Sequence, residues 1–163
     1  MSFFKNKTKN RTFFIAEIGI NHNGSIDEAL KLITAAKLSG CDCVKFQKRT
    51  PKICTPKSQW DILRETPWGK IKYIEYKNKI EFGKKEYDVI DKFCKKNEIL
   101  WTASCWDVPS VKFIEKYNVP FHKVASACIT DFSLLEKLKK TKKPIIISTG
   151  MSNEKQINKA VKF

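Results

Sequence analysis

The sequence predicts an α/β fold built on a parallel sheet. Short apolar runs alternate with amphipathic segments along the chain, an order typical of parallel strands joined by right-handed helical crossovers. Polar residues follow the ends of these runs, where folds of this class keep their functional groups. Two sheet architectures fit the pattern. A doubly wound open sheet can end after five strands, whereas a (β/α)8 barrel needs eight strands and about 250 residues.

The first unit combines a strand at residues 12–18 with the helix that follows it. The strand is an apolar run ending at Gly19, and Asn23-Gly24 predicts the turn. Ser25 and Glu28 have the spacing of a capping box, and Ser39-Gly40 predicts the end of the helix. Apolar residues recur at helical spacing between these signals: Ile26, Ala29, Leu30, Ile33 and Ala36.

Four further units repeat this order. Apolar runs predict strands at residues 43–47, 99–104, 121–126 and 144–149. Helices are predicted over residues 84–97 and after Asp107, Asp131 and Ser152. The last helix reaches Phe163 without a Gly, Asn or Pro to end it, so we expect the chain to be part of a longer fold.

One connection, residues 48–79, is much longer than the usual strand-to-helix loop. It contains three prolines and several large aromatic residues. Long connections in compact domains often serve as lids or binding loops. An aromatic flap that covers a barrel edge fits the composition equally well.

The composition indicates a globular protein with a packed core. Hydrophobic residues make up 42% of the chain and aromatic residues 12%. No apolar stretch approaches the roughly 20 residues needed to cross a bilayer, and the basic start lacks a secretory cleavage site, so we expect a cytoplasmic protein. The six cysteines form no Cys-x-x-Cys pair and are expected to be reduced and structural.

The formal net charge is +15. A non-catalytic basic fragment that binds anions or nucleic acid is one interpretation. The lysines are scattered, however, and no recognisable nucleic-acid-binding motif accompanies them, which favours a solvated surface. Glycine-rich dinucleotide and triphosphate loops and a serine nucleophile elbow are also absent from the sequence. A positive cleft would still attract phosphorylated anions.

The candidate site residues are polar groups at the predicted strand ends. Two lysines with several hydroxyl and amide groups describe an anion site, because ammonium groups supply charge and hydroxyls supply directional hydrogen bonds. Glu17 is a candidate acid or base, or the ion-pair partner of Lys45. His22 is either functional or a turn cap, and His122 is expected to be structural. The full set is Glu17, Asn21, Lys45, Gln47, Ser104, Lys123, Ser126, Ser148 and Thr149.

Four blocks of the sequence resemble the N-acetylneuraminate (sialic acid) synthase family. They are AEIGINHNG at residues 16–24, VKFQ at 44–47, HKVAS at 122–126 and PIIISTGM at 144–151. The resemblance implies a (β/α)8 TIM-type barrel, of which about the first five βα units are present. It divides the chain into a basic N-terminal segment, residues 1–11, and a partial barrel domain, residues 12–163.

The resemblance also implies a transferase reaction. Family members condense phosphoenolpyruvate with an N-acetylated amino sugar such as N-acetylmannosamine, forming a nine-carbon 2-keto sugar acid and releasing phosphate. Legionaminic, pseudaminic and spore-polysaccharide sugar acids are alternative products. Carbon 3 of phosphoenolpyruvate attacks the aldehyde, which a divalent metal (Mn²⁺ or Mg²⁺) polarises as Lewis acid, and water then adds at carbon 2. The resemblance implies a homodimer for the full-length form, with neither nucleic acid nor membrane as partner.

By the same resemblance, Lys45, Ser104, Lys123 and Ser126 hold phosphoenolpyruvate, Gln47 contacts the sugar, and Glu17 acts as acid, base or water-orienting group. This chain departs from the family pattern at two places. Ser104 stands where the family usually has threonine, and Ser126-Ala-Cys128 stands where many members have Ser-Gly-Glu, which leaves the acceptor sugar open. The family's metal-binding histidines and its antifreeze-like domain belong to later blocks, so we expect no metal ligand here and no activity from the chain alone.

Overall fold

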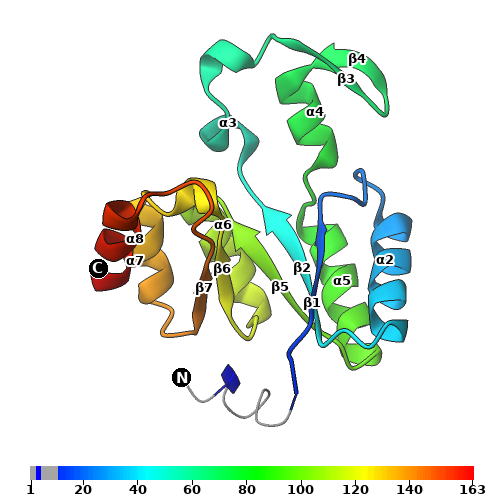
Figure 1. Cartoon of the computed structure of the whole chain (residues 1–163). Helices are drawn as coiled ribbons and strands as arrows, with labels where there is room; N and C mark the ends of the chain where they lie inside the picture. Colours follow the sequence, from blue (N-terminus) through cyan, green and yellow to red (C-terminus); the bar gives the residue numbers. More distant parts are fainter. Residues whose placement is uncertain (1–2, 5–10) are drawn as a thin grey trace.

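The structure is a computed structural model that describes residues 3–4 and 11–163. The remainder of the predicted basic segment, residues 1–2 and 5–10, lies outside the described residues. Five parallel strands form one sheet in the order β1-β2-β5-β6-β7, and helices follow them along the chain (Figure 1). The predicted alternation is confirmed. None of the helices in the described ranges is long and apolar enough to span a membrane.

The element bounds agree closely with those predicted. The strands are β1 (Ile15–Gly19), β2 (Cys43–Lys48), β5 (Leu100–Cys105), β6 (His122–Val124) and β7 (Ile145–Ile147). The helices that follow them are α2 (Ile26–Leu38), α5 (Lys84–Lys96), α6 (Val108–Ile114), α7 (Phe132–Lys139) and α8 (Glu154–Lys162). The predicted fourth and fifth strands are both shorter than expected. The fourth ends early because the chain turns into the 3-10 helix η3 (Ser126–Cys128).

Two helix starts differ from the prediction. Ser25 Oγ accepts from the backbone N–H of Glu28 at 3.3 Å, but the Glu28 carboxylate pairs with Lys31 Nζ at 2.8 Å, so only half of the predicted capping box forms. At α8 the cap is Asn153, not Ser152. Asn153 and Gln156 exchange two side-chain-to-backbone bonds, of 2.9 and 3.0 Å, and complete a capping box there.

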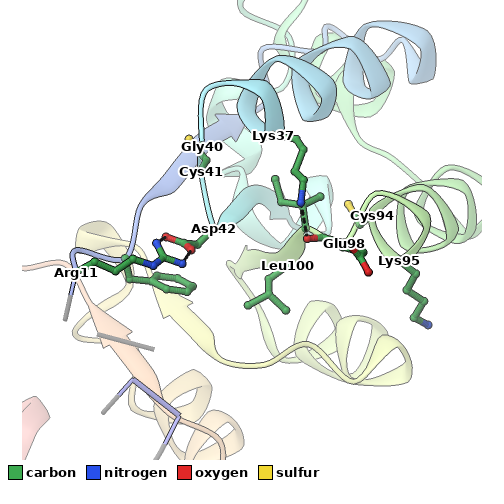
Figure 2. Close-up of a pocket in the computed structure, with 11 residues that line it drawn as sticks. Arg11, Lys37, Gly40, Cys41, Asp42, Cys94, Lys95, Glu98 and Leu100 are labelled. Atoms are coloured by element: carbon green, nitrogen blue, oxygen red, sulfur yellow. Dashed lines mark hydrogen bonds and ion pairs between the residues drawn. The ribbon is translucent and has the colours of Figure 1, made fainter. Parts of the chain in front are cut away.

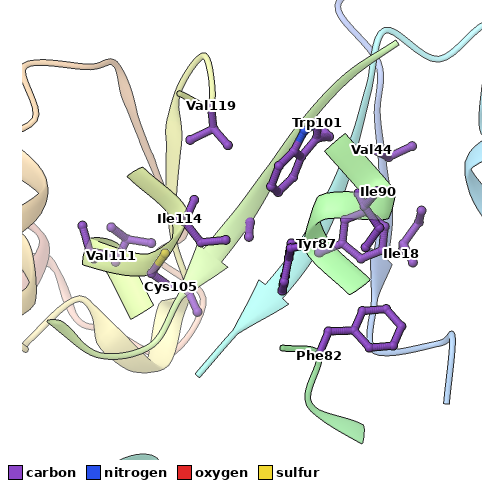
Figure 3. Packing of buried hydrophobic residues seen from close by; sticks show 14 of the residues in the cluster. Ile18, Val44, Phe82, Tyr87, Ile90, Trp101, Cys105, Val111, Ile114 and Val119 are labelled. Carbon is purple, nitrogen blue, oxygen red and sulfur yellow. The ribbon is translucent and has the colours of Figure 1, made fainter. Parts of the chain in front are cut away.

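One hydrophobic core lies between the sheet and its helices (Figure 3). Val44 of β2 and Trp101 of β5 face it, and Tyr87 and Ile90 of α5 pack against them. Full burial of an aliphatic side chain such as Val44 or Ile90 contributes about 2 kcal/mol to the free energy of folding. Because successive strand residues point to opposite faces, fixing Val44 in the core turns Lys45 to the other face.

The long connection is a folded lobe, residues 50–82, and not a loop. It contains α3 (Pro51–Cys54), the 3-10 helix η1 (Lys57–Gln59), the antiparallel hairpin β3 (Leu63–Thr66) and β4 (Gly69–Lys72), and α4 (Tyr73–Ile80). Figure 1 shows this 50–82 lobe standing at the carboxyl end of β2. It therefore lies on the side of the sheet where this fold class places its functional groups.

Two buried carboxylates attach the 50–82 lobe to the sheet. Asp107 accepts bonds from the hydroxyl of Thr50, at 3.1 Å, and from the thiol of Cys54, at 3.1 Å. Glu81 pairs with Lys48 at 3.0 Å and with Arg49 Nε at 3.2 Å. Asp107 holds the first residues of the lobe, and Glu81 holds the end of the lobe against the residues that precede it. Both anchors fix its position over the strand ends.

The opposite end of the sheet is covered by aromatic rings. Phe13 precedes β1 and Phe121 precedes β6, and their ring centroids lie 6.3 Å apart. Phe3 and Phe4 pack on Phe121 with centroid distances of 5.9 and 5.2 Å. Part of the predicted basic segment thus contributes apolar contacts under the amino ends of the strands.

Candidate active site

Polar side chains from four strands share the face of the sheet that points away from the core. In the parallel register Glu17 is paired with Lys45, and Ser104 is paired with both Gln47 and Lys123. Residues in register on neighbouring parallel strands point to the same face. The structure therefore brings onto one surface five of the six residues to which the family resemblance assigns a role.

Lys45 lies at the centre of this group. Its ammonium forms an ion pair with the Glu17 carboxylate and donates a hydrogen bond of 2.9 Å to Ser104 Oγ. The Lys45 side chain is 7% exposed, whereas that of Glu17, on the edge strand β1, is 53% exposed. Lys45 is thus held in place from both sides, while Glu17 remains accessible from solvent.

Lys123 adds a second cation. Burial lowers the pKa of its ammonium below the ordinary value, the nearby positive charge of Lys45 lowers it further, and Glu17 opposes both effects. Two ammonium groups thus lie near one carboxylate, and among the described residues only that of Lys45 forms an ion pair with it. Because their charges are not fully balanced, a bound anion would relieve the repulsion between them.

Gly19 leaves space between the Glu17 carboxylate and the Gln47 amide. It has a φ of +57°, a conformation that side chains rarely adopt, and a Cβ placed on it would lie 3.2 Å from Glu17 Oε1 and 3.4 Å from Gln47 Nε2. The glycine therefore lets the carboxylate and the amide flank one small space at the end of β1.

The other predicted residues are less closely joined to this group. Ser126 is half-buried at the start of η3, just past the end of β6. Ser148 donates its backbone N–H to Val124, whereas Asn21 and Thr149 are exposed. Ser126 is thus placed at the same end of the sheet, and Asn21 and Thr149 at its rim.

Both histidines have structural environments. His22 is buried and stacks on Phe82 with ring centroids 3.8 Å apart, and its Nδ1 accepts from the backbone N–H of Gly24 at 3.1 Å. The turn-cap alternative is therefore the one that these contacts favour. Burial lowers the pKa of His22 to about 4. His122 is fully buried on the core side of β6, 3.0 Å from Glu115, in agreement with the prediction.

Four of the six cysteines, Cys43, Cys94, Cys105 and Cys128, are buried. All six are free thiols, and burial raises the pKa of Cys94 to about 12. A thiol with such a pKa is protonated near neutral pH and is a poor nucleophile or metal ligand. Among the described residues, no group of three His, Cys, Asp or Glu side chains could hold a metal ion. The described residues therefore do not fit a metal site by themselves.

A cavity of about 630 Å³ opens at the amino ends of the strands, away from these residues (Figure 2). Arg11 forms an ion pair with Asp42 there, and Lys37 donates to the backbone oxygen of Glu98 at 3.0 Å. The cavity contains none of the predicted site residues. In barrel folds this end serves stability and not catalysis.

Two side chains that sequence reasoning missed lie near the candidate site. Arg49 follows Gln47 by two positions and Trp106 follows Ser104 by two positions, just beyond the ends of β2 and β5. The backbone N–H of Trp106 bonds to the oxygen of Lys48 at 3.0 Å, which continues the ladder. The same period-two pattern that identified Lys45 and Gln47 would have identified Arg49.

Residues 32–163, more than half of the chain, match the NeuB family. The chain belongs to the NeuB family. The matched region includes Lys45, Gln47, Ser104, Lys123 and Ser126, whereas Glu17 precedes it. The predicted family and the barrel type of the fold are thus confirmed.

Similar proteins are named as sugar acid synthases. The chain is 38% identical over 157 residues to N-acetylneuraminate-9-phosphate synthase of Drosophila melanogaster, covering 95% of this chain and 42% of that protein. It is 33% identical to N,N'-diacetyllegionaminic acid synthase of Campylobacter jejuni, covering 93% of this chain and 46% of that protein. The chain therefore spans less than half the length of these relatives.

A solved structure shows the same fold. The N-acetylneuraminic acid (sialic acid) synthetase of Leptospira borgpetersenii, crystallised with citrate, superposes with a TM-score of 0.80 at 29% identity. The superposition covers 94% of this chain and 50% of that chain. The five strand–helix units described here thus correspond to half of a NeuB-family protein.

Proposed function

We propose that this chain carries the phosphoenolpyruvate-binding part of a sugar acid synthase. The reaction would join carbon 3 of phosphoenolpyruvate to the aldehyde of an N-acetylated amino sugar, with addition of water at carbon 2 and release of phosphate. The observation that carries the proposal is the ion pair and hydrogen bond that link Glu17, Lys45 and Ser104, with Lys123 in register beside Ser104.

The charge of the site supports a substrate with two acidic groups. Phosphoenolpyruvate has a carboxylate and a phosphate, and Lys45 and Lys123 supply two cations on one face. Hydroxyl groups add directional bonds to such oxyanions, a role proposed for Ser104 and Ser126. The lowered pKa of Lys123 is consistent with a cation that lacks a full counter-charge until the anion binds.

Glu17 and Gln47 are proposed for the reacting side of the site. The Glu17 carboxylate is half-exposed yet tied to Lys45, so it is placed to orient or deprotonate the water that adds at carbon 2. Gln47 lies across the space left by Gly19 and is proposed to contact the sugar. We extend the proposal to a divalent metal held by residues other than those described here, and to a cytoplasmic homodimer.

Calorimetric titration with phosphoenolpyruvate tests the proposal. The chain is expected to bind phosphoenolpyruvate, and Lys45→Met and Lys123→Met are each expected to weaken binding at least tenfold, the effect of about 1.4 kcal/mol for a lost charged contact. Lys116→Met is the matched control, because it removes the same charge at an exposed position on η2 (Glu115–Tyr117). Equal weakening by all three substitutions would mean that only the net charge matters, and the proposal would fail.

A further inference from the structure

Positive charge is concentrated in one part of the chain, away from the candidate active site. Residues 137–163 contain eight lysines, one glutamate and no arginine, a net charge of +7 against +15 for the whole chain. They form the end of α7, the edge strand β7 and the helix α8, and Figure 1 shows α7 and α8 side by side. Nearly half of the net charge therefore lies at one edge of the sheet.

Aromatic rings join the two helices into one surface. Phe132 at the start of α7 and Phe163 after α8 have ring centroids 5.3 Å apart. The ammonium of Lys159 lies 4.7 Å from the ring centroid of Phe132, and that of Lys139 lies 5.3 Å from the ring centroid of Phe163. Such contacts hold a lysine against the protein while its charge stays in water.

Six exposed lysines define this α7–α8 surface: Lys139, Lys140, Lys142, Lys155, Lys159 and Lys162. The first three line a hollow of about 520 Å³, and the last three line a second hollow of about 570 Å³. Glu136 pairs with Lys140 at 2.6 Å, but none of the lysines of the second hollow forms an ion pair within the described ranges. The surface therefore offers several uncompensated cations to a partner with many negative charges.

The side chains among these lysines favour a lipid surface over a nucleic acid. Val161 is 71% exposed on α8, and Phe163, which lines the first hollow, is 44% exposed. Exposed apolar side chains beside lysines are typical of helices that lie in the headgroup region of a bilayer. Arginine, whose planar fork suits phosphates in fixed positions, is absent from residues 137–163. Flexible lysines suit mobile headgroups.

We propose that the α7–α8 surface binds the headgroups of an anionic lipid bilayer, so that the chain lies peripherally on a membrane. The six lysines face the headgroups, and Val161 and Phe163 reach the boundary with the acyl chains. Each lysine near such a bilayer strengthens binding about fivefold, the equivalent of about 1 kcal/mol. This surface is not part of the proposed function, and it departs from the expectation of no membrane partner that the family resemblance implies.

Binding at this surface leaves the proposed phosphoenolpyruvate site accessible. The sheet order places β7 at one edge and β1, with Glu17, at the other. Lys45 lies on β2, next to β1. A bilayer on α7 and α8 therefore covers the β7 edge and not the edge that carries the ion pair of Glu17 and Lys45.

Sedimentation with lipid vesicles tests the inference. The chain is expected to bind mixed phosphatidylserine–phosphatidylcholine vesicles and not vesicles of phosphatidylcholine alone. Replacing the three α8 lysines together by glutamine is expected to weaken this binding at least tenfold. Val161→Ser, which leaves the charge unchanged, is expected to weaken it about threefold, because an apolar contact with the bilayer is lost.

The matched control removes the same charge from α5. Lys85, Lys92 and Lys96 are exposed there and form no ion pair within the described ranges, and replacing all three by glutamine is expected to change vesicle binding by at most about twofold. Circular dichroism checks that each variant is folded, and each should keep its affinity for phosphoenolpyruvate.

Four results would overturn the inference. They are no binding to the anionic vesicles, equal binding to the neutral vesicles, equal weakening by the α5 and α8 substitutions, and tighter binding of a duplex oligonucleotide than of anionic vesicles at the same ionic strength. The third would mean that only net charge matters, and the fourth that the surface serves a nucleic acid. None of them bears on phosphoenolpyruvate binding, which tests the proposed function separately.

Discussion

Asp107 gives the sharpest test of how the 50–82 lobe is attached. Its buried carboxylate accepts from the backbone N–H of Ser110 at 2.7 Å, as the cap of α6, and also from Thr50 and Cys54 in the lobe. Burial alone would raise its pKa, but the bonds from Thr50, Cys54 and Ser110 outweigh burial and lower it. Asp107→Ala removes all of these bonds at once.

Asp131 is the matched control, because its carboxylate caps α7 through Leu134 at 3.0 Å and lies at an exposed position. Loss of a cap costs about 1 kcal/mol, the value expected for Asp131→Ala. Asp107→Ala should cost about 3 kcal/mol, since it also strands the Thr50 N–H and releases the lobe.

Urea unfolding followed by tryptophan fluorescence measures both costs, and hydrogen exchange locates the effect. In Asp107→Ala the amides of residues 50–54 should exchange faster, whereas in Asp131→Ala they should not. Equal unfolding free energies for the two variants, within about 0.5 kcal/mol, would refute the reasoning that Asp107 joins the lobe to the sheet.

Three further outcomes are expected. His22 has a pKa of about 4 in the folded chain against an ordinary value of 6.5, so the unfolded chain takes up the proton first. The free energy of unfolding should therefore fall by up to about 3 kcal/mol as pH falls from about 6.5 to about 4, and His22→Phe should reduce that fall in pH-dependent urea unfolding. Gly24→Ala should lower the melting temperature far more than Gly40→Ala: both glycines have positive φ, but a Cβ at Gly24 would lie 2.5 Å from the oxygen of Lys79, whereas one at Gly40 meets nothing within 4 Å. As the pH rises toward the ordinary lysine pKa of 10.5, phosphoenolpyruvate should bind with proton uptake, because the anion raises the lowered pKa of Lys123. Calorimetry in buffers of different ionisation enthalpy measures this, and uptake that persists in Lys123→Met would contradict it.

The arrangement of the sheet could be predicted because each strand is a separate apolar run. Val44 and Phe46 are buried in the core, and alternation then sends Lys45 and Gln47 to the opposite face. The parallel pairing of β1 with β2 then aligns Lys45 with Glu17. Convergence at one edge of a parallel sheet is therefore readable from sequence.

The 50–82 lobe was not predictable in the same way. Its elements are short, and α3 contains no buried residue of its own. It is stabilised by Asp107 and Glu81, which lie far from its first residues in the sequence. Local patterns do not encode such tertiary contacts.

The missed site residues and the half-formed capping box have related causes. The backbone N–H of Ser25 donates to the oxygen of His22 at 2.9 Å, and the Glu28 carboxylate pairs with the ammonium of Lys31 instead. Whether Arg49 Nη2 finds an acceptor depends on how the lobe packs, which the order of residues does not reveal. Competition and packing, and not periodicity, decide these details.

Backbone hydrogen exchange with and without phosphoenolpyruvate tests the central claim most directly. We expect slower exchange in β2, β5 and β6 around Lys45, Ser104 and Lys123, with the amino-end cavity at Arg11 and Asp42 unaffected. A duplex oligonucleotide should leave the strand amides unchanged. Protection that is absent from those strands, or that a duplex reproduces with strong salt dependence, would contradict the account.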